Sequence, residues 1–431
     1  MGIRWPFLAV LVTFLPAPVN GAGQSETALR LGPAIQPLNG PWRFRTGDDP
    51  RWKDPTFDDA DWQAVDLAAE SGSHDPDVGL PDYVAGWMAR GHPTHAGYAW
   101  YRLRVRWEGP PAADLVLLGP TLVDDAYQVY WNGQLLGGSG DWRDPPRIYG
   151  TKPALFRLPA GPGTPEAVIA VRVYMLPGEE RLPDSGGLHV APALATPEAG
   201  KDRHLVQWQR TIAGYVVDLI EPLLFVLTAA FGAFVARLAP DRARGVLLLA
   251  SAAVLTALLR VGQVIFFWTD LLDLRTLLRL QGLLLRPLGL LAWALAWNCW
   301  LLPPDRRVDR AAGALAGVCA AGWLLESRST LLLHAGRWGF MLLFAWLALR
   351  ILRGGEHRVV AVASLLLIAA GQFAPELSSL GVPGIWFPFG VGVSRTQFAY
   401  ALAIPLLVVL LGRVAPGRSP EWQPAPSPSP A

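Results

Sequence analysis

The stretch DDAYQVYWNGQLLG, residues 124–137, reads as two short strands joined by a tight turn. Asn132 and Gly133 supply the two positive-φ positions that a type I′ turn needs, so the stretch predicts a β-hairpin. From about residue 212 onward the chain instead becomes almost continuously apolar. The first expectation is therefore a soluble β-domain followed by a bundle of membrane helices.

The region around this hairpin, between about residues 30 and 200, contains short apolar or alternating runs separated by Gly, Pro, Asp and Asn, which is typical of an all-β sandwich. In one run the apolar or aromatic positions are Tyr101, Leu103, Val105 and Trp107, and the alternating positions are Arg102, Arg104 and Arg106. This period of two predicts a strand with one buried face and with arginines that face water or line a groove. Both cysteines, Cys299 and Cys319, lie in later apolar segments, so we expect this domain to fold without disulfides.

Three motifs in order give a resemblance: LNGPWRFRTGDDPRWKDPTFDDADWQAVDL, YAWYRLRVRW and DDAYQVYWNGQLLGG. Together they resemble the N-terminal sugar-binding jelly roll of family 2 glycoside hydrolases and related galactose-binding-like modules. The resemblance implies a jelly roll over residues 24–200 and a carbohydrate as its ligand. In those hydrolases the catalytic carboxylates belong to a separate barrel domain, whereas membrane helices follow here. No catalytic residue is transferred, and we do not expect an enzyme.

The two ends of the chain read differently from its domains. Residues 1–22 combine one arginine, a run of about a dozen apolar residues and small residues near the end, which predicts a secretory signal peptide. An uncleaved anchor is the alternative. Residues 413–431 are rich in Pro, Ser and Ala, so we expect a disordered cytoplasmic tail and an output that acts through a separately encoded cytoplasmic signalling protein.

The apolar half, residues 208–412, predicts an all-α bundle of seven transmembrane helices. The segments are 212–236, 245–267, 278–302, 309–325, 331–351, 359–375 and 394–412. Most arginines between them fall in alternate connections and in the tail, namely Arg237, Arg242, Arg244, Arg306, Arg307, Arg310, Arg350, Arg353, Arg358, Arg413 and Arg418. By the positive-inside rule, these connections and the C-terminus face the cytoplasm and the jelly roll is extracytoplasmic.

An exported jelly roll ahead of seven helices resembles the bacterial seven-transmembrane receptors with diverse intracellular signalling modules. The resemblance rests on architecture and covers nearly the whole chain. It implies a multi-pass sensor of the bacterial cytoplasmic (inner) membrane.

Several ionisable residues fall within the predicted helices, where charge is costly and usually faces the bundle interior or a watery cavity. They are Asp218, Glu221, Arg260, Arg286, Arg337, Glu376 and Arg395. One interpretation is a set of ion pairs that fix helix packing, and the other is a polar pocket that opens toward the β-domain. We expect Asp218 and Glu221 to pair with at least one of Arg260, Arg286, Arg337 and Arg395. Arg286 is the favoured partner, because its mid-span position leaves it least able to reach interfacial water.

Two groups in the β-domain are further candidates. Trp142, Arg143 and Arg147 lie in a long polar loop whose composition suits stacking on a sugar or pairing with an anion, although the loop could equally pack on the bundle. His92, His95 and Asp75 have metal-like spacing without a fourth ligand, and Asp58-Asp59 is interpreted as a turn. We therefore expect no metal and no cofactor.

The leading hypothesis is a membrane sensor that binds a carbohydrate or other small ligand and relays the signal through its bundle. The alternative is a non-switching binding or scaffold protein for polysaccharide or envelope enzymes. A membrane enzyme or transporter is disfavoured because the sequence has no nucleophile and base in a catalytic pattern and no continuous polar track. The formal net charge of +2 does not favour nucleic acid, and the sequence leaves open whether the chain forms a homodimer.

Overall fold

A computed structural model describes residues 34–75, 79–106, 114–159, 166–178, 184–325, 330–354, 357–386 and 392–414. The predicted signal peptide and nearly all of the predicted tail lie outside these residues. Two larger antiparallel sheets and a two-stranded one, β6 (Val123–Asp124) with β11 (Gly187–Leu188), form the N-terminal region. The four-stranded sheet has the order β1 (Ile35–Pro37), β12 (Ala193–Ala195), β5 (Val116–Leu118), β9 (Leu155–Arg157). The six-stranded sheet has the order β3 (Gln63–Val65), β2 (Trp42–Thr46), β4 (Gly97–Arg106), β10 (Glu166–Met175), β7 (Ala126–Trp131), β8 (Gln134–Ser139).

The hairpin that opened the sequence argument is β7–β8, and its turn is confirmed. Asn132 and Gly133 both have positive φ, 45° and 82°, and the two flanking strands pair antiparallel. Next to β7 lies β10, which pairs with β4 along all ten residues from Glu166↔Arg106 to Met175↔Gly97. These long strands are the centre of the six-stranded sheet.

The core between the two sheets contains residues of both. Ile169 and Val171 of β10 belong to the same buried cluster as Leu117 of β5 and Leu194 of β12. The residues alternate along each strand, so one face of each sheet loses its contact with water and supplies the hydrophobic stabilisation. The β-region is therefore a sandwich, as the sequence predicts.

Arg102 departs from the prediction that the β4 arginines face water. Its side chain is 0% exposed and forms an ion pair with Asp59 at 2.7 Å. Its guanidinium also donates to the carbonyl oxygens of Trp52, Asp54 and Phe57. The outward face of β4 is covered here by the 50–62 segment, so a position that alternation marks as exposed lies inside a second small core.

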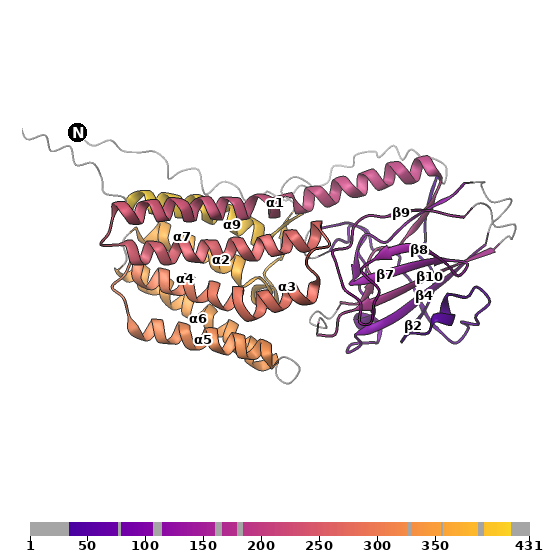
Figure 1. Ribbon diagram of the computed structural model, residues 1–431, viewed down its shortest axis with the longest axis horizontal. Coiled ribbons are helices and arrows are strands. Elements are labelled where there is room, and N and C mark those ends of the chain that lie inside the picture. Colours follow the sequence, from indigo (N-terminus) through magenta and orange to yellow (C-terminus); the bar gives the residue numbers. More distant parts are fainter. Residues whose placement is uncertain are drawn as a thin grey trace, which may run out of the picture. The chain divides into compact units, whose positions relative to one another are not determined.

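The C-terminal half is helical, with a helix at each of the seven predicted segments (Figure 1). The helices are α1 (Pro197–Leu238), α2 (Ala243–Trp268), α3 (Leu274–Leu280), α4 (Arg286–Trp300), α5 (Arg306–Leu324), α6 (Thr330–Gly354), α7 (Arg358–Gln372), α8 (Ala374–Ser379) and α9 (Arg395–Val414). A π-helical turn, η3 (Gln281–Leu285), joins α3 to α4, so the third predicted segment is one interrupted helix.

Five of these helical stretches are long and apolar enough to cross a membrane: Pro197–Leu238, Ala243–Trp268, Leu274–Trp300, Leu331–Gly354 and Arg395–Arg413. Helix α7 is apolar but shorter, and α5 is not among the five. The protein thus has the helices of a multi-pass membrane protein, while the total of seven spans stays a prediction.

Helix α1 is much longer than the predicted segment 212–236. Its 42 residues correspond to about 63 Å, roughly twice the hydrocarbon thickness of a bilayer. The first turns lie against the four-stranded sheet: a Cβ added at Gly200 would come within 2.3 Å of Val116 Cγ2 and 3.4 Å of Leu155 Cδ1. The sequence argument missed this extension because residues 197–211 are too polar to register as a span.

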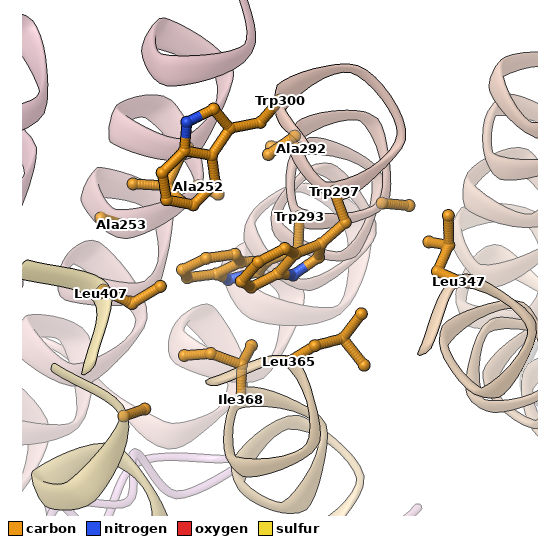
Figure 2. Close-up of a cluster of buried hydrophobic side chains, with 14 of the residues drawn as sticks. Ala252, Ala253, Ala292, Trp293, Trp297, Trp300, Leu347, Leu365, Ile368 and Leu407 are labelled. Atoms are coloured by element: carbon orange, nitrogen blue, oxygen red, sulfur yellow. The ribbon is translucent and has the colours of Figure 1, made fainter. Parts of the chain in front are cut away.

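Tryptophans of α4 form the centre of the bundle core. Trp293, Trp297 and Trp300 are each at most 4% exposed, and Figure 2 shows them surrounded by small and branched side chains of neighbouring helices, including Ala252, Leu365 and Leu407. Trp293 also donates its indole N–H to Thr256 Oγ1 at 3.0 Å, which satisfies the buried polar group. This packing fixes α4 and, with it, the π-helical turn that precedes it.

Candidate functional site

A cavity of about 1010 Å³ lies where loops of the β-domain meet one end of the helices. Its β wall is formed by Asp124, Asp125, Asp184 and Ser185. Its helix wall includes residues of η3, α4, α5, α6, α8 and α9, with charged side chains from Arg286, Arg337, Glu376 and Arg395. Cavities of this size accommodate drug-sized ligands. Four members of the predicted charge cluster therefore line one cavity.

The β wall holds a carboxylate–imidazole pair, in which the His189 ring is buried and the Asp124 side chain is 34% exposed. Asp124 Oδ2 accepts from Gly186 N at 2.9 Å and lies 3.1 Å from His189 Nε2. His189 Nδ1 lies 2.9 Å from the carbonyl oxygen of Val84. Because both ring nitrogens face acceptors, the protonated imidazolium is the form that satisfies both contacts. Burial opposes a charge on His189, but its hydrogen bond to Asp124 and the negative charge there hold its pKa above the usual value.

Asp184 extends this acidic wall. Its Oδ2 accepts from the Tyr83 hydroxyl at 2.8 Å, and the Tyr83 ring stacks on His189 at a centroid distance of 5.0 Å. Burial, and next the bond to Asp184, raise the pKa of Tyr83, so the hydroxyl stays a donor. Among the described residues, neither Asp124 nor Asp184 forms an ion pair with Lys or Arg.

On the helix wall, Arg337 of α6 is paired with Glu376 of α8. Arg337 Nη2 donates to Glu376 Oε2 at 2.8 Å and to the carbonyl oxygen of Gln372 at 2.9 Å, and its Nε donates to the other carboxylate oxygen. This bidentate geometry is the strong form of an Arg–carboxylate pair. It joins α6 to the end of α7 and leaves the pair electrically neutral.

Arg395, the first residue of α9, is only 3% exposed and has no carboxylate partner among the described residues. Its Nη1 donates to the carbonyl oxygens of Val382 and Pro383 at 2.7 and 2.9 Å, and Nη2 donates to Ser378 Oγ at 2.9 Å and to the carbonyl oxygen of Ala374. Its Nε is buried without a hydrogen-bond partner. Arg395 thus organises the turn after α8 with neutral acceptors, so its positive charge is not cancelled locally.

Arg286 reaches the cavity through the π-helical turn. Pro287 has no N–H, so the carbonyl of Leu283 lacks the donor that an α-helix would supply. The Arg286 backbone N–H instead bonds to the carbonyl of Gln281, and its Nη2 donates to Gln281 Oε1 at 2.9 Å. Single π turns occur often at functional sites, and here the turn places an arginine in the cavity lining.

The remaining intramembrane charges form a separate group next to the cavity. Arg260 pairs with both predicted carboxylates, contacting Asp218 through Nη2 and Glu221 Oε2 through Nε at 2.9 Å. Gln397 Nε2 also donates to Asp218 Oδ1 at 3.0 Å. Arg260 is one of the four partners that the sequence argument names, but that argument favours Arg286, whereas the structure pairs the carboxylates with Arg260. Both carboxylates lie on the face of α1 that packs against α2. Arg260 belongs to α2, so it is the arginine that contacts them.

The predicted sugar-binding loop packs against the bundle. Trp142 shares a buried cluster with Phe266, Leu274 and Leu278, and Arg172 lies over its ring at 4.7 Å. The backbone of the same loop bonds to the bundle through Leu274 N and the carbonyl of Ile148, at 2.9 Å. This geometry corresponds to the packing alternative rather than to an open stacking platform.

The two arginines of that loop lie at the surface. Arg143 pairs with Asp141 at 2.6 Å with a side chain that is 59% exposed. Arg147 is exposed, and its backbone forms a bridge with Asp141. Neither arginine lines the cavity, so the structure does not bring Trp142, Arg143 and Arg147 into one binding surface.

The histidines with metal-like spacing have other contacts. His92 Nε2 lies 2.8 Å from Gln63 Oε1, and His95 Nε2 lies 3.0 Å from the carbonyl oxygen of Tyr98. Within the described ranges, no three His, Cys, Asp or Glu side chains are arranged to hold a metal ion. In the acidic pair, Asp58 accepts from Ala60 N as a turn residue does, while Asp59 is the partner of Arg102.

Sequence reasoning missed the whole β wall. Asp124 and Asp125 begin the very stretch that identified the hairpin, but nothing in their spacing relates them to Asp184 or to His189. Only the pairing of β6 (Val123–Asp124) with β11 (Gly187–Leu188) brings these segments together. The loops contain Tyr, Asp and His residues, which are common in binding sites. However, no sequence periodicity relates residues of separate loops, so this composition does not show which of them come together.

Comparisons with solved structures match the N-terminal β-region to family 2 glycoside hydrolases. A β-glucuronidase from Bacteroides uniformis matches at 18% identity and a TM-score of 0.28, over 37% of this chain and 17% of that one. A Bifidobacterium dentium β-glucuronidase complexed with coumarin-3-O-glucuronide matches at 19% identity and a TM-score of 0.25, over 38% of this chain and 30% of that one. The chain thus spans less than a third of the length of these enzymes. No family model and no curated protein matches it.

Proposed function

We propose that this protein is a sensor of the bacterial inner membrane, with its jelly roll outside the cytoplasm, that holds a small ligand between the β-domain and the helix ends. The bundle then relays occupancy to a cytoplasmic signalling protein. The observation that carries this proposal is the shared cavity, because a ligand there touches both regions at once. A ligand that contacts two elements changes their equilibrium by its differential affinity for the two arrangements.

Helix α1 supplies a path for the signal. It begins two residues after β12 ends, packs on the four-stranded sheet, and continues into the bundle without a loop. A loop would absorb a movement of the sheet, whereas a continuous helix passes it on. The bridge between Gly150 N and the carbonyl of Phe266, at 3.3 Å, ties the sheet to the end of α2 as well.

A carbohydrate is one class of ligand that a jelly roll suits, although a fold alone does not determine its ligand. The second candidate is a membrane-anchored binding or scaffold protein, in which the same domain binds a polysaccharide or an envelope enzyme without switching. The tight packing of Trp142 and Ile148 on the bundle favours the sensor, because a pure anchor needs no such contact.

The test is hydrogen-exchange mass spectrometry on the purified full-length protein in lipid nanodiscs. A glycan array first identifies a bound oligosaccharide, and exchange is then compared with and without it. The sensor predicts altered exchange both in the 184–189 loop and at the far helix ends, in peptides that cover 357–364 and 405–414 and contain no cavity-lining residue. Binding with unchanged exchange at those helix ends would favour the scaffold.

The orientation of the bundle is a part of the proposal with its own test. Arg350 Nη1 donates to Asn298 Oδ1 at 2.8 Å, and Arg413 Nη1 lies 3.5 Å from His357 Nδ1, so several arginine-rich helix ends gather at the end away from the cavity. The positive-inside rule places that end in the cytoplasm. We expect a C-terminal alkaline phosphatase fusion to be inactive and a cysteine at Arg143 to react with impermeant maleimide. An active fusion would reverse the orientation.

A further inference from the structure

Helix α1 has one packed face and one exposed face. Phe225 and Gly232 belong to the packed face, where a Cβ added at Gly232 would lie 3.5 Å from Ala250 Cβ of α2 and 3.8 Å from Leu411 Cδ1 of α9. The opposite face carries large apolar side chains that are each at least 38% exposed: Leu205, Ile212, Val216, Leu219, Leu223 and Val226.

The exposed side chains follow a heptad pattern. Starting at Leu205, steps of four and three residues alternate through Gln209, Ile212, Val216, Leu219 and Leu223 to Val226. This is the spacing of the a and d positions in a two-stranded coiled coil, and it continues over three heptads. We call these seven residues the α1 seam, with Leu205, Ile212, Leu219 and Val226 at d positions and the other three at a positions.

Lipid is able to cover only part of the α1 seam. Arg237 ends the apolar part of α1, and a hydrocarbon layer of about 30 Å is crossed by about 20 helical residues. Leu205 precedes Arg237 by 32 residues, or about 48 Å of helix. The first turn of the seam therefore lies in water, where Leu205 is 59% exposed and its neighbour Val206 is 37% exposed. Burial of these side chains requires a protein partner.

We infer that the α1 seam is a dimer interface, which packs against the same seam of a second copy as a parallel two-stranded coiled coil. Two copies in one membrane have the same orientation, so a twofold axis along the membrane normal brings each seam residue to its own counterpart. This inference does not depend on the proposed ligand site, because its occupant is a second copy of this chain.

The polar residues of the helix favour a second copy as the occupant. Gln209 is exposed and takes an a position, where two carboxamides in a parallel pair face each other and bond together. A single polar residue at an a position sets the register of a coiled coil. One turn earlier, exposed Lys201 and Asp202 take neighbouring g and a positions, so each copy offers the other an opposite charge. The surface is thus self-complementary.

Disulfide crosslinking in native membranes tests the seam at two depths. The background is the full-length chain with Cys299→Ala and Cys319→Ala, which removes both cysteines of the sequence. Single cysteines are then introduced at two d positions, Leu205→Cys in the aqueous part and Leu219→Cys in the membrane part. Because each chain contains one cysteine, a disulfide-linked species of twice the chain mass contains two copies.

Matched controls occupy exposed b positions of the same helix. Arg210→Cys lies in the aqueous part and Leu224→Cys in the membrane part. We expect at least about fivefold more disulfide-linked dimer at each d position than at its control, because facing d residues approach within disulfide distance and b residues point away. Equal yields at d and b positions would indicate random collision and overturn the dimer. Absence of dimer at both d positions would also overturn it.

A charge-exchange experiment tests the same contact with both native cysteines present. Two copies with different affinity tags are expressed together, and capture of one through the other is measured after mild solubilisation. We expect capture to fall about tenfold or more when both copies carry Leu205→Glu or both carry Leu205→Lys, because like charges then face each other. The mixed Glu and Lys pair should recover capture. Arg210→Glu in both copies, the exposed control, should leave capture unchanged.

The outcomes also distinguish other occupants of the seam. Equal capture in the like-charge and mixed pairs would mean that Leu205 does not face its counterpart, and it would overturn the inference. A disulfide adduct of Leu205→Cys with a mass other than twice that of the chain would assign the seam to a different protein. Dimers without any ligand-dependent change in hydrogen exchange would leave this inference standing and count against the sensor.

Discussion

The β-domain and the helix bundle both bury arginines, but they balance the charge in different ways. Arg102 in the β-domain has a carboxylate, Asp59, and three carbonyl oxygens around a single guanidinium. Arg395 in the bundle has only carbonyl and hydroxyl oxygens. In the first arrangement the charge of Arg102 is neutralised by Asp59, so this arginine has a structural role. The second leaves charge at a cavity, where a ligand is able to use it.

The comparison predicts that Arg102 is the more costly residue to remove. Arg102→Met would leave Asp59 buried without a counterion, and breaking a buried pair in this way costs about 3–5 kcal/mol. Pulse proteolysis in urea, on the full-length protein in mild detergent, measures the loss in the free energy of unfolding. Arg106→Met on the same strand is the control, because its side chain is 79% exposed, and it should change the free energy by less than about 1 kcal/mol.

The partner of Arg102 supplies a second check. Replacing Asp59 by Asn in the Arg102→Met background removes the uncompensated charge and should recover part of the loss. Strictly additive effects of the two substitutions would mean that Arg102 is held by its carbonyl contacts and packing, and the contrast with Arg395 would lose its basis.

The next effect in size concerns the charge group beside the cavity. Arg260→Met would leave Asp218 and Glu221 without their shared cation, at a cost of about 2–3 kcal/mol by the cost of a charged side chain inside a membrane helix. Glu221→Gln in the same background should recover part of it, since Asp218 keeps its bond from Gln397. The same proteolysis assay applies. If Arg286→Met is equally costly and is the variant that Glu221→Gln rescues, Arg286 rather than Arg260 is the partner.

Particular residues also show which features of the fold can be predicted from the sequence. Asn132-Gly133 and the alternation of Tyr101 with Leu103 predict the hairpin and the central strand, because both signals are local. Arg102 fails the same rule, since alternation says which face a side chain takes but not whether another segment covers that face. The sequence also misses the polar start of α1, for a related reason. Hydropathy identifies helical segments that face lipid, whereas residues 197–211 are polar and begin against a sheet.

The cavity lining likewise contains residues that the sequence identifies and residues that it does not. The charged residues of the helix wall stand out because charge in an apolar run is rare, so the sequence identifies Arg286, Arg337, Glu376 and Arg395. It places them in one cluster with Asp218, Glu221 and Arg260, which lie apart from the cavity lining. Asp124, in the two-residue strand β6, and Asp184, in a loop, do not stand out from the other aspartates of the β-domain. Their meeting depends on sheet topology over 60 residues of chain, which no local pattern encodes.

The Asp124–His189 pair makes the β wall sensitive to pH. The pKa of His189 is raised, so its contribution to stability is complete below its unfolded pKa of about 6.5 and disappears as pH rises through the folded value. Burial opposes the charge of Asp124, yet the bond from His189 lowers its pKa, so the contribution of Asp124 disappears at acidic pH instead. The pair is therefore most stabilising in the mildly acidic range.

The expected change is a loss of about 1–2 kcal/mol in the free energy of unfolding between pH 6 and pH 9, from one charge-assisted hydrogen bond. Asp184 also makes the charged form of this histidine more favourable, and the Tyr83 ring stacks on it. Proteolysis in urea across the pH range measures the slope, and His189→Gln should flatten it. A wild-type slope that His189→Gln leaves intact would assign the pH dependence to another group.

The smallest change in the free energy of unfolding is expected for Arg143, because this arginine is exposed to solvent whereas Arg102 and Arg395 are buried. Its pair with Asp141 is more than half exposed on the arginine side, and surface pairs of this kind contribute about 0–1 kcal/mol. Arg143→Ala should therefore leave the free energy of unfolding nearly unchanged. Because Arg143 does not line the cavity, the same variant should also bind carbohydrate like the wild type on the glycan array. A marked loss of carbohydrate binding in Arg143→Ala would instead restore the 137–150 loop as a sugar-binding surface and move the ligand site away from the cavity.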